Sequence, residues 1–144
     1  MDFSQTYPGL PSMVPAIRAF IAALLDGSPR REDAAVIVSE LATNSLRHTP
    51  SGDPDGQIWV AVSITTGWAR IAVTDQGGGG WERAMGHAGE DEETGRGLEI
   101  VEALANKFGH DITEAGQTVW AELTWSGPET TAAGSSAGSP AAVQ

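Results

Sequence analysis

The order of helical and strand patterns is the feature that most constrains the fold of this 144-residue chain. Apolar residues recur at helical spacing from Ser12 to Leu25 and again from Arg31 to His48. Two alternating segments follow, from Gln57 to Thr65 and from Trp68 to Thr74. The Thr66-Gly67 pair between them predicts a hairpin.

Further segments complete the expected order. Phe3 to Tyr7 predicts a short edge strand, Leu98 to Phe108 a third helix, and His110 to Glu114 and Thr118 to Trp125 two strands. The glycine-rich segment from Gly77 to Gly95 predicts a functional lid or a disordered loop. We therefore expect an α+β two-layer sandwich, with a mixed, mostly antiparallel sheet covered on one face by helices.

The composition limits the partners. A formal net charge of -11 argues against nucleic acid and against an anionic membrane surface, because both require a basic patch. No apolar stretch approaches the roughly 20 residues that a membrane span needs. The chain has no cysteine, and its N-terminus lacks the basic and apolar regions of a signal peptide, so a cytoplasmic location is expected.

The last 19 residues of the chain differ in composition from the rest. Residues 126–144 consist mainly of Ser, Ala, Gly, Thr and Pro, with no large apolar residue. Such a segment cannot bury enough surface to offset its ordering entropy, so we expect a disordered tail. Residues 1–125 are expected to form one domain.

Glu40, Asn44 and His48 are spaced four residues apart on the second predicted helix. They line one edge of its apolar arc and therefore lie at the border of the buried face. The arc consists of Ala34, Ile37, Val38, Leu41 and Ser45, whereas Leu46 falls on the far side. Asn44 can give Mg²⁺ an uncharged oxygen ligand, and Glu40 can accept a proton from an attacking hydroxyl. An ordinary solvated helix is the alternative.

A predicted strand ends at Asp75, and the four glycines from Gly77 to Gly80 follow. A backbone that approaches a flat ring closely needs residues without a Cβ atom. A buried aspartate at a strand end can accept a hydrogen bond from the exocyclic amine of adenine. The alternative is a glycine-rich turn in which the aspartate has its usual turn-starting role.

Gly95, Arg96 and Gly97 come directly before the third predicted helix, which begins at Leu98. Glycines that open a helix expose its first free N–H groups to an anion, and Arg96 can pair with a phosphate. The alternative is a flexible loop entering a helix. The dinucleotide and P-loop glycine spacings are both absent from the chain.

In their order and spacing, the three motifs resemble those of the Bergerat-fold ATPase superfamily, which includes gyrase, histidine kinases and MutL. Glu40 and Asn44 look like its N box, the segment from Asp75 to Gly79 like its G1 box, and Gly95 to Gly97 like its G2 box. Within this superfamily, the chain is most similar to the small anti-sigma-factor serine/threonine kinases, over residues 5–125.

The resemblance implies roles for the matched residues. Glu40 would be the catalytic base, Asn44 would coordinate Mg²⁺, and Asp75 would bind the adenine amino group. Thr118 would support Asp75, directly or through water. The residues implied to bind ATP are Asn44, Asp75, Gly77, Gly79, Gly95, Arg96, Gly97, Leu98 and Thr118.

The resemblance also implies partners. A serine or threonine of an anti-sigma-factor antagonist would be phosphorylated with ATP and Mg²⁺, and a sigma factor would be sequestered by what is commonly a homodimer. The chain departs from the family at Gly80-Trp81 and in the acidic run from Glu90 to Glu93, which is either solvated or faces a basic partner. The alternatives are a non-catalytic ATP-gated binding module, a histidine-kinase catalytic domain and an α+β domain without a ligand.

Overall fold

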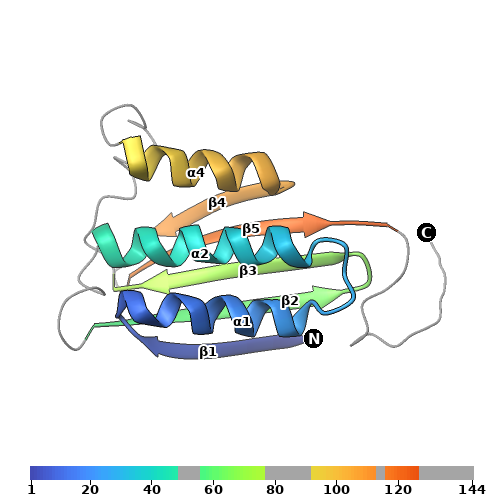
Figure 1. Ribbon diagram of the computed structural model, residues 1–144, viewed down its shortest axis with the longest axis horizontal. Helices are drawn as coiled ribbons and strands as arrows, with labels where there is room; N and C mark the ends of the chain where they lie inside the picture. Colours follow the sequence, from blue (N-terminus) through green and yellow to red (C-terminus); the bar gives the residue numbers. More distant parts are fainter. Residues whose placement is uncertain (49–55, 77–91, 113–115, 127–144) are drawn as a thin grey trace.

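The computed structural model describes residues 1–48, 56–76, 92–112 and 116–126, and for His48 and residues 92–97 it describes the backbone only. The elements are β1 (Asp2–Pro8), η1 (Pro11–Met13), α1 (Val14–Leu24), α2 (Arg31–His48), β2 (Gln57–Thr65), β3 (Trp68–Asp75), α4 (Glu92–Leu104), β4 (Lys107–Ile112) and β5 (Gln117–Thr124). The helices α1, α2 and α4 cover one face of the sheet (Figure 1). The predicted α+β two-layer fold is therefore confirmed.

The sheet has the strand order β1-β2-β3-β5-β4. Every strand pairing among the described residues is antiparallel, so this part of the sheet is more regular than the mixed sheet expected. β1 is an edge strand, as predicted, and β2 and β3 form the predicted hairpin. Gly67 in the turn has a φ of 72°, a conformation that glycine adopts without strain. β5 lies between β3 and β4, so β3 and β5 are central neighbours.

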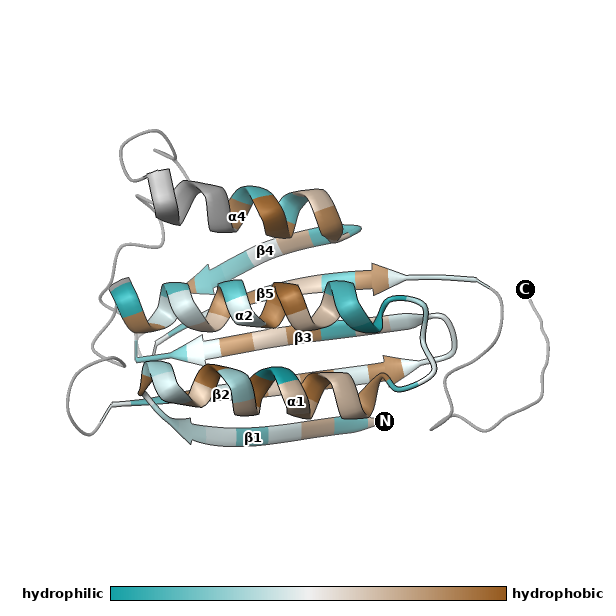
Figure 2. Cartoon of the chain, viewed as in Figure 1, coloured by the Kyte–Doolittle hydropathy of each residue, from teal (hydrophilic) through white to brown (hydrophobic). Residues whose placement is uncertain are grey.

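Helix α2 is the central helix of the upper layer, because it packs against α1 on one side and α4 on the other, above β3 (Figure 1). Its bounds, Arg31–His48, are those predicted from the sequence. Figure 2 shows hydrophilic residues at both ends of α2 and hydrophobic residues interspersed with hydrophilic ones between them. One expectation is corrected: Leu46 is partly buried against the core, because two flanking helices cover more of α2 than a single apolar arc.

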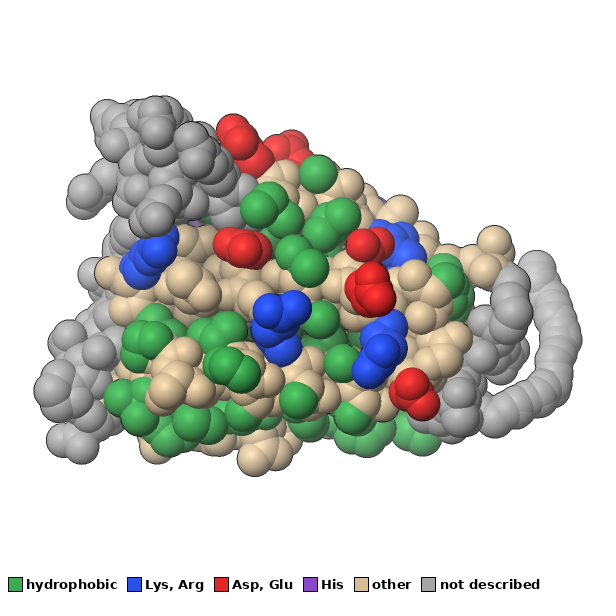
Figure 3. Space-filling model, in the orientation of Figure 1, with side chains coloured by type: hydrophobic (Ala, Val, Ile, Leu, Met, Phe, Trp, Pro, Cys, Tyr) green, Lys and Arg blue, Asp and Glu red, His purple; other side chains and the backbone are tan. Residues whose placement is uncertain are grey.

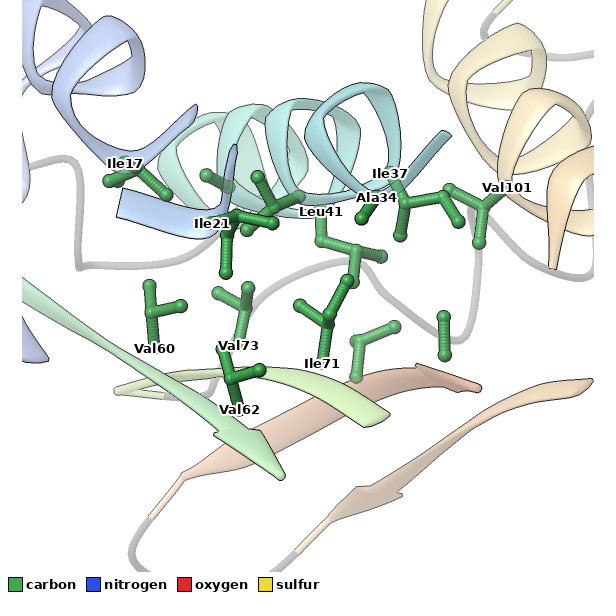
Figure 4. Packing of buried hydrophobic residues seen from close by; sticks show 14 of the residues in the cluster. Ile17, Ile21, Ala34, Ile37, Leu41, Val60, Val62, Ile71, Val73 and Val101 are labelled. Atoms are coloured by element: carbon green, nitrogen blue, oxygen red, sulfur yellow. The ribbon is translucent and has the colours of Figure 1, made fainter. Parts of the chain in front are cut away.

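The hydrophobic core lies between the helices and the sheet (Figure 4). Alternate residues of each central strand point into it, as the two-residue period of a strand requires. The helices contribute residues at spacings of three and four. The fully buried large side chains are Ile17, Ile21, Leu25, Ile37, Leu41, Ile58, Ile71, Leu123, Val38, Val60 and Val62. The predicted apolar arc of α2 is thus confirmed.

Helix α4 differs from the predicted third helix at both ends. It begins at Glu92, so Gly95 and Gly97 lie inside it rather than before it. A glycine in a helix interior costs only about 1 kcal/mol, which the buried contacts of Leu98 and Val101 can offset. The helix ends at Leu104, and Phe108 belongs to strand β4.

The sheet face opposite the helices carries aromatic side chains. Trp59 is 38% exposed there, and Trp68 donates a long hydrogen bond of 3.5 Å to Glu122. The guanidinium of Arg70 stacks on the ring of Trp120, with its central carbon 4.7 Å from the ring centroid. These contacts hold the aromatic side chains against the sheet face that the helices leave uncovered.

Arg30 joins several elements at the end of the sheet where α4 and β5 finish. Its guanidinium donates to Asp33 at 2.9 Å, to the Thr124 carbonyl at 2.8 Å, and to the Leu104 carbonyl. It also donates to the Asn106 side-chain oxygen at 3.1 Å. One side chain therefore ties the start of α2 to the ends of α4 and β5, which anchors α4 at this end of the molecule.

Candidate nucleotide site

Four elements meet at the end of the molecule opposite Arg30. The last turns of α2 and the last residues of β3 lie there, together with the first residues of β5 and of α4 (Figure 1). The sequence places Asn44 on α2 and Asp75 on β3, so two motifs separated by 30 residues come to the same end of the fold. The fold thus brings the first two predicted motifs together.

Buried polar residues are concentrated at this end. Asn44 is 2% exposed, Asp75 is fully buried, and Gln117 is 4% exposed. Of the five buried polar residues in the described ranges, only Ser28 lies elsewhere, since Ser45 follows Asn44 on α2. Burying polar groups costs free energy unless they find partners, so such a group at one end of a hydrophobic core is typical of a ligand site.

Glu40 and Asn44 lie one turn apart on α2, and Glu40 is half-buried. They therefore lie at the border of the buried face, as predicted. The side-chain N–H₂ group of Asn44 has no hydrogen-bond partner among the described residues. A buried amide with unused hydrogen-bonding capacity fits a side chain that meets a ligand, and its oxygen suits Mg²⁺.

The amide oxygen of Asn44 is the kind of uncharged ligand that suits Mg²⁺. In the described part of the chain, no three His, Asp or Glu side chains gather as a metal-binding group. Mg²⁺ is commonly held by one or two protein oxygens, with phosphates and water completing its shell. The donor set around Asn44 therefore fits an ion that arrives with a nucleotide.

The register of the sheet determines which residue of β5 lies beside Asp75. Thr118 pairs with Thr74, and the two hydroxyls lie 2.8 Å apart. Because side chains alternate along a strand, Thr118 lies on the sheet face opposite that of Asp75. The residue directly across from Asp75 is Gln117, which the sequence prediction missed. A one-residue shift in register moves a side chain to the other face, and the motif alone could not supply that register.

Gly116 comes into very close contact with the backbone of Asp75. A Cβ atom built on Gly116 would lie 2.1 Å from the Asp75 carbonyl oxygen. Any side chain at this position would therefore push β5 away from the end of β3. The absence of a side chain allows the two strand ends to meet and brings Gln117 opposite Asp75.

The remaining predicted site residues lie outside the described residues, within α4, or in the hydrophobic core. Gly77 and Gly79 lie outside the described residues, as do Trp81 and the start of the acidic run. Gly95, Arg96 and Gly97 lie within α4, so the free N–H groups of this helix belong to its first turn, which precedes Gly97. Leu98 is buried in the hydrophobic core, where its side chain serves packing. The predicted tail lies outside the described residues beyond Ser126.

An antiparallel sheet covered on one face by three helices agrees with the fold of ATPase domains of the histidine kinase type. The sequence matches the histidine kinase-like ATPase domain over residues 7–123. This match covers most of the chain, and the chain belongs to that family.

Two curated proteins are similar to part of the chain. The anti-sigma F factor of Halalkalibacterium halodurans is 33% identical over 63 residues, and the anti-sigma F factor of Geobacillus sp. (strain WCH70) is 30% identical over 63 residues. Each alignment covers 44% of this chain and 43% of the relative. Within the described ranges, no helix has both the length and the apolar character needed to cross a bilayer.

Proposed function

We propose that this protein is an ATP-binding regulatory protein of the anti-sigma-factor type. It phosphorylates a serine or threonine of an anti-sigma-factor antagonist and sequesters a sigma factor in a partner switch. The observation that carries the proposal is the group of buried polar residues, Asn44, Asp75 and Gln117, at one end of the sheet. Membership in the ATPase family supports ATP as the ligand, and the two similar anti-sigma F factors support the regulatory role.

The nucleotide is held from two sides. Asp75 accepts a hydrogen bond from the adenine amino group, since an ionised carboxylate offers only acceptors. Asn44 supplies one oxygen ligand to Mg²⁺, which neutralises charge that develops on the phosphates. Gly77 and Gly79 allow close approach to the ring, and the segment 95–97 holds the phosphates.

Glu40 is the proposed general base. Its carboxylate takes the proton of the attacking serine or threonine hydroxyl while that oxygen bonds to the γ-phosphorus of ATP. The bond between the γ-phosphorus and the bridging oxygen breaks, and ADP leaves. The half-buried position of Glu40, one turn before Asn44, supports this role. A base for a protein substrate has to lie beside the phosphates and still be reachable from outside.

The partners are proteins rather than nucleic acids or membranes. Among the described residues of the helix-bearing face, Lys and Arg side chains are interspersed with Asp and Glu side chains and form no basic patch (Figure 3). With a net charge of -11, the chain would repel a phosphate backbone or an anionic lipid surface. We propose a cytoplasmic protein that forms a homodimer and binds the sigma factor and the antagonist in turn.

A non-catalytic, ATP-gated binding module is the second candidate. The observation in its favour is that nucleotide binding is supported by three buried polar residues, whereas phosphoryl transfer depends on Glu40 alone. Such a module would exchange partners when ATP binds and would leave them unmodified.

Melting with and without Mg-ATP tests binding first. At an ATP concentration about 100 times the Kd, ATP should stabilise the protein by about 2.7 kcal/mol. Asn44→Ala should remove the part of this effect that depends on Mg²⁺. A melting temperature that ATP leaves unchanged in the wild-type protein would contradict the proposed function.

Transfer of labelled phosphate from ATP to candidate antagonists then separates the two functions. Glu40→Gln should keep ATP binding and lose phosphorylation, whereas Glu32→Gln, at an exposed glutamate on the same helix, should keep both. Nucleotide-dependent partner capture without any labelled antagonist in the wild-type reaction would favour the non-catalytic module.

A further inference from the structure

Gln117 occupies a special position in the sheet. It is the first residue of β5 and the direct partner of Asp75 in the antiparallel pairing of β3 and β5. Side chains of directly opposite residues in an antiparallel pair lie on the same face, close to one another. Gln117 and Asp75 therefore both face the helix layer, at the end of the sheet where Asn44 lies.

The amide of Gln117 has a hydrogen-bond donor without a partner. The side chain is 4% exposed, and its Nε2 atom has no hydrogen-bond partner among the described residues. A buried N–H₂ group that loses water and finds no acceptor destabilises the fold. A ligand that brings an acceptor to this position would recover the lost hydrogen bond.

The two side chains together offer one acceptor and one donor. Asp75 presents carboxylate oxygens, which accept, and Gln117 presents an N–H₂ group, which donates. Adenine carries the matching pair side by side on one edge, because its exocyclic amine donates and its ring atom N1 accepts. Guanine and hypoxanthine carry the reverse pair, because O6 accepts and N1–H donates. The pairing of Asp75 with Gln117 is therefore complementary to adenine and opposed to guanine.

We propose that Gln117 is a specificity-determining residue, whose Nε2 donates a hydrogen bond to N1 of adenine while Asp75 accepts from the amine. This inference rests on the proposed function, because it assumes that the nucleotide binds at this end of the sheet. Gly116 positions the pair: its missing side chain lets β5 approach the Asp75 carbonyl closely. Gln117 thus takes the place that the sequence analysis assigned to Thr118.

An adenine analogue tests the inference without altering the protein. In 1-deaza-ADP, a C–H group replaces N1 and the exocyclic amine remains. By calorimetric titration with Mg²⁺, the wild-type protein should bind 1-deaza-ADP about tenfold more weakly than ADP, because the Gln117 donor loses its acceptor. The 7-deaza analogue, which lacks an acceptor elsewhere on the ring, should bind within about twofold of ADP.

Gln117→Met is the matched variant, because methionine is similar in length and has no N–H donor. It should bind ADP and 1-deaza-ADP with affinities that differ by no more than about twofold. Equal affinities for the two ligands in the wild-type protein would overturn the inference, as would a tenfold difference that persists in Gln117→Met. If Gln117→Met does not fold, Gln117→Leu, which also lacks a side-chain donor, takes its place in the same comparison. Failure of ADP and ATP to bind the wild-type chain at all would instead overturn the proposed function.

Discussion

The hydroxyl groups of Thr74 and Thr118 lie 2.8 Å apart on the sheet face that the helices leave uncovered. One residue further along β3, Asp75 points to the other face and is fully buried beneath the helices. The boundary between the candidate nucleotide site and the open sheet face therefore runs between two consecutive residues. The register separates the hydrogen bond between the two threonines from the buried carboxylate that we propose binds adenine.

Thr118→Val should lower stability and leave nucleotide binding unchanged. The substitution removes the hydroxyl that bonds to Thr74, which is worth about 1 kcal/mol, and keeps the shape of the side chain. Because Thr118 faces away from Asp75, the Kd for ADP should stay within about twofold of the wild-type value. Denaturant unfolding and calorimetric titration check the two parts. A tenfold loss of affinity would restore the role that the sequence resemblance implied for Thr118.

Gly116→Ala should both destabilise the fold and weaken nucleotide binding. The new Cβ atom would meet the Asp75 carbonyl oxygen at 2.1 Å, so the end of β5 has to move. We expect a loss of about 1–3 kcal/mol in the free energy of unfolding and a weaker affinity for ADP.

Gly109→Ala is the comparison for this variant. Its Cβ atom would meet the ring of Trp120 at 2.8 Å, away from the candidate site. It should destabilise the protein without a comparable loss of affinity at a temperature where both variants are folded. Equal effects of the two variants on the Kd for ADP would mean that Gly116 has no special role at the site.

Arg30→Ala should destabilise the protein more than the substitution of a partly exposed arginine usually does. The substitution removes hydrogen bonds to the carbonyls of Thr124 and Leu104 and to the side chain of Asn106. We expect a loss of about 2–3 kcal/mol, measured by urea unfolding. Arg31→Ala is the matched control, because Arg31 is exposed and donates to the Ala22 carbonyl, and it should cost less than about 1 kcal/mol. Similar losses in both variants would show that Arg30 does not anchor α4.

Ionisation of Tyr7 should lower the free energy of unfolding at high pH. Burial raises the pKa of Tyr7 above the ordinary value of 10.0. Its ring packs edge-on against that of Phe20, with the two ring centroids 6.4 Å apart. The unfolded state therefore loses the phenolic proton first, so stability is fully present below pH 10 and declines as the pH rises from there through the pKa of the folded state.

Tyr7 is the only tyrosine in the chain, so tyrosinate absorbance reports its pKa directly. A titration of the folded protein should give a midpoint above that of the unfolded protein. In Tyr7→Phe, this part of the decline in unfolding free energy should be absent. Coincident midpoints in the folded and unfolded states would contradict the prediction.

Much of the fold was predictable because its patterns are local. The bounds of α2 followed from apolar spacing, and the hairpin of β2 and β3 followed from alternation around Thr66-Gly67. The predicted start of α4 was wrong, because the low helix propensity of Gly95 and Gly97 indicated that the helix begins after them. The packing of Leu98 and Val101 in the core outweighs so small a cost. The partial burial of Leu46 was missed because the number of helices flanking α2 is a tertiary property.

Some residues of the candidate site were likewise predictable from local patterns, and others were not. Local spacing along the chain was sufficient to predict Asn44 on the buried border of a helix and Asp75 at the end of a strand, because both periods are set within a few residues. The identity of the residue opposite Asp75 required the assembled sheet, because strand register depends on pairing between segments about 40 residues apart. That pairing places Gln117 beside Asp75 and turns Thr118 toward the other face.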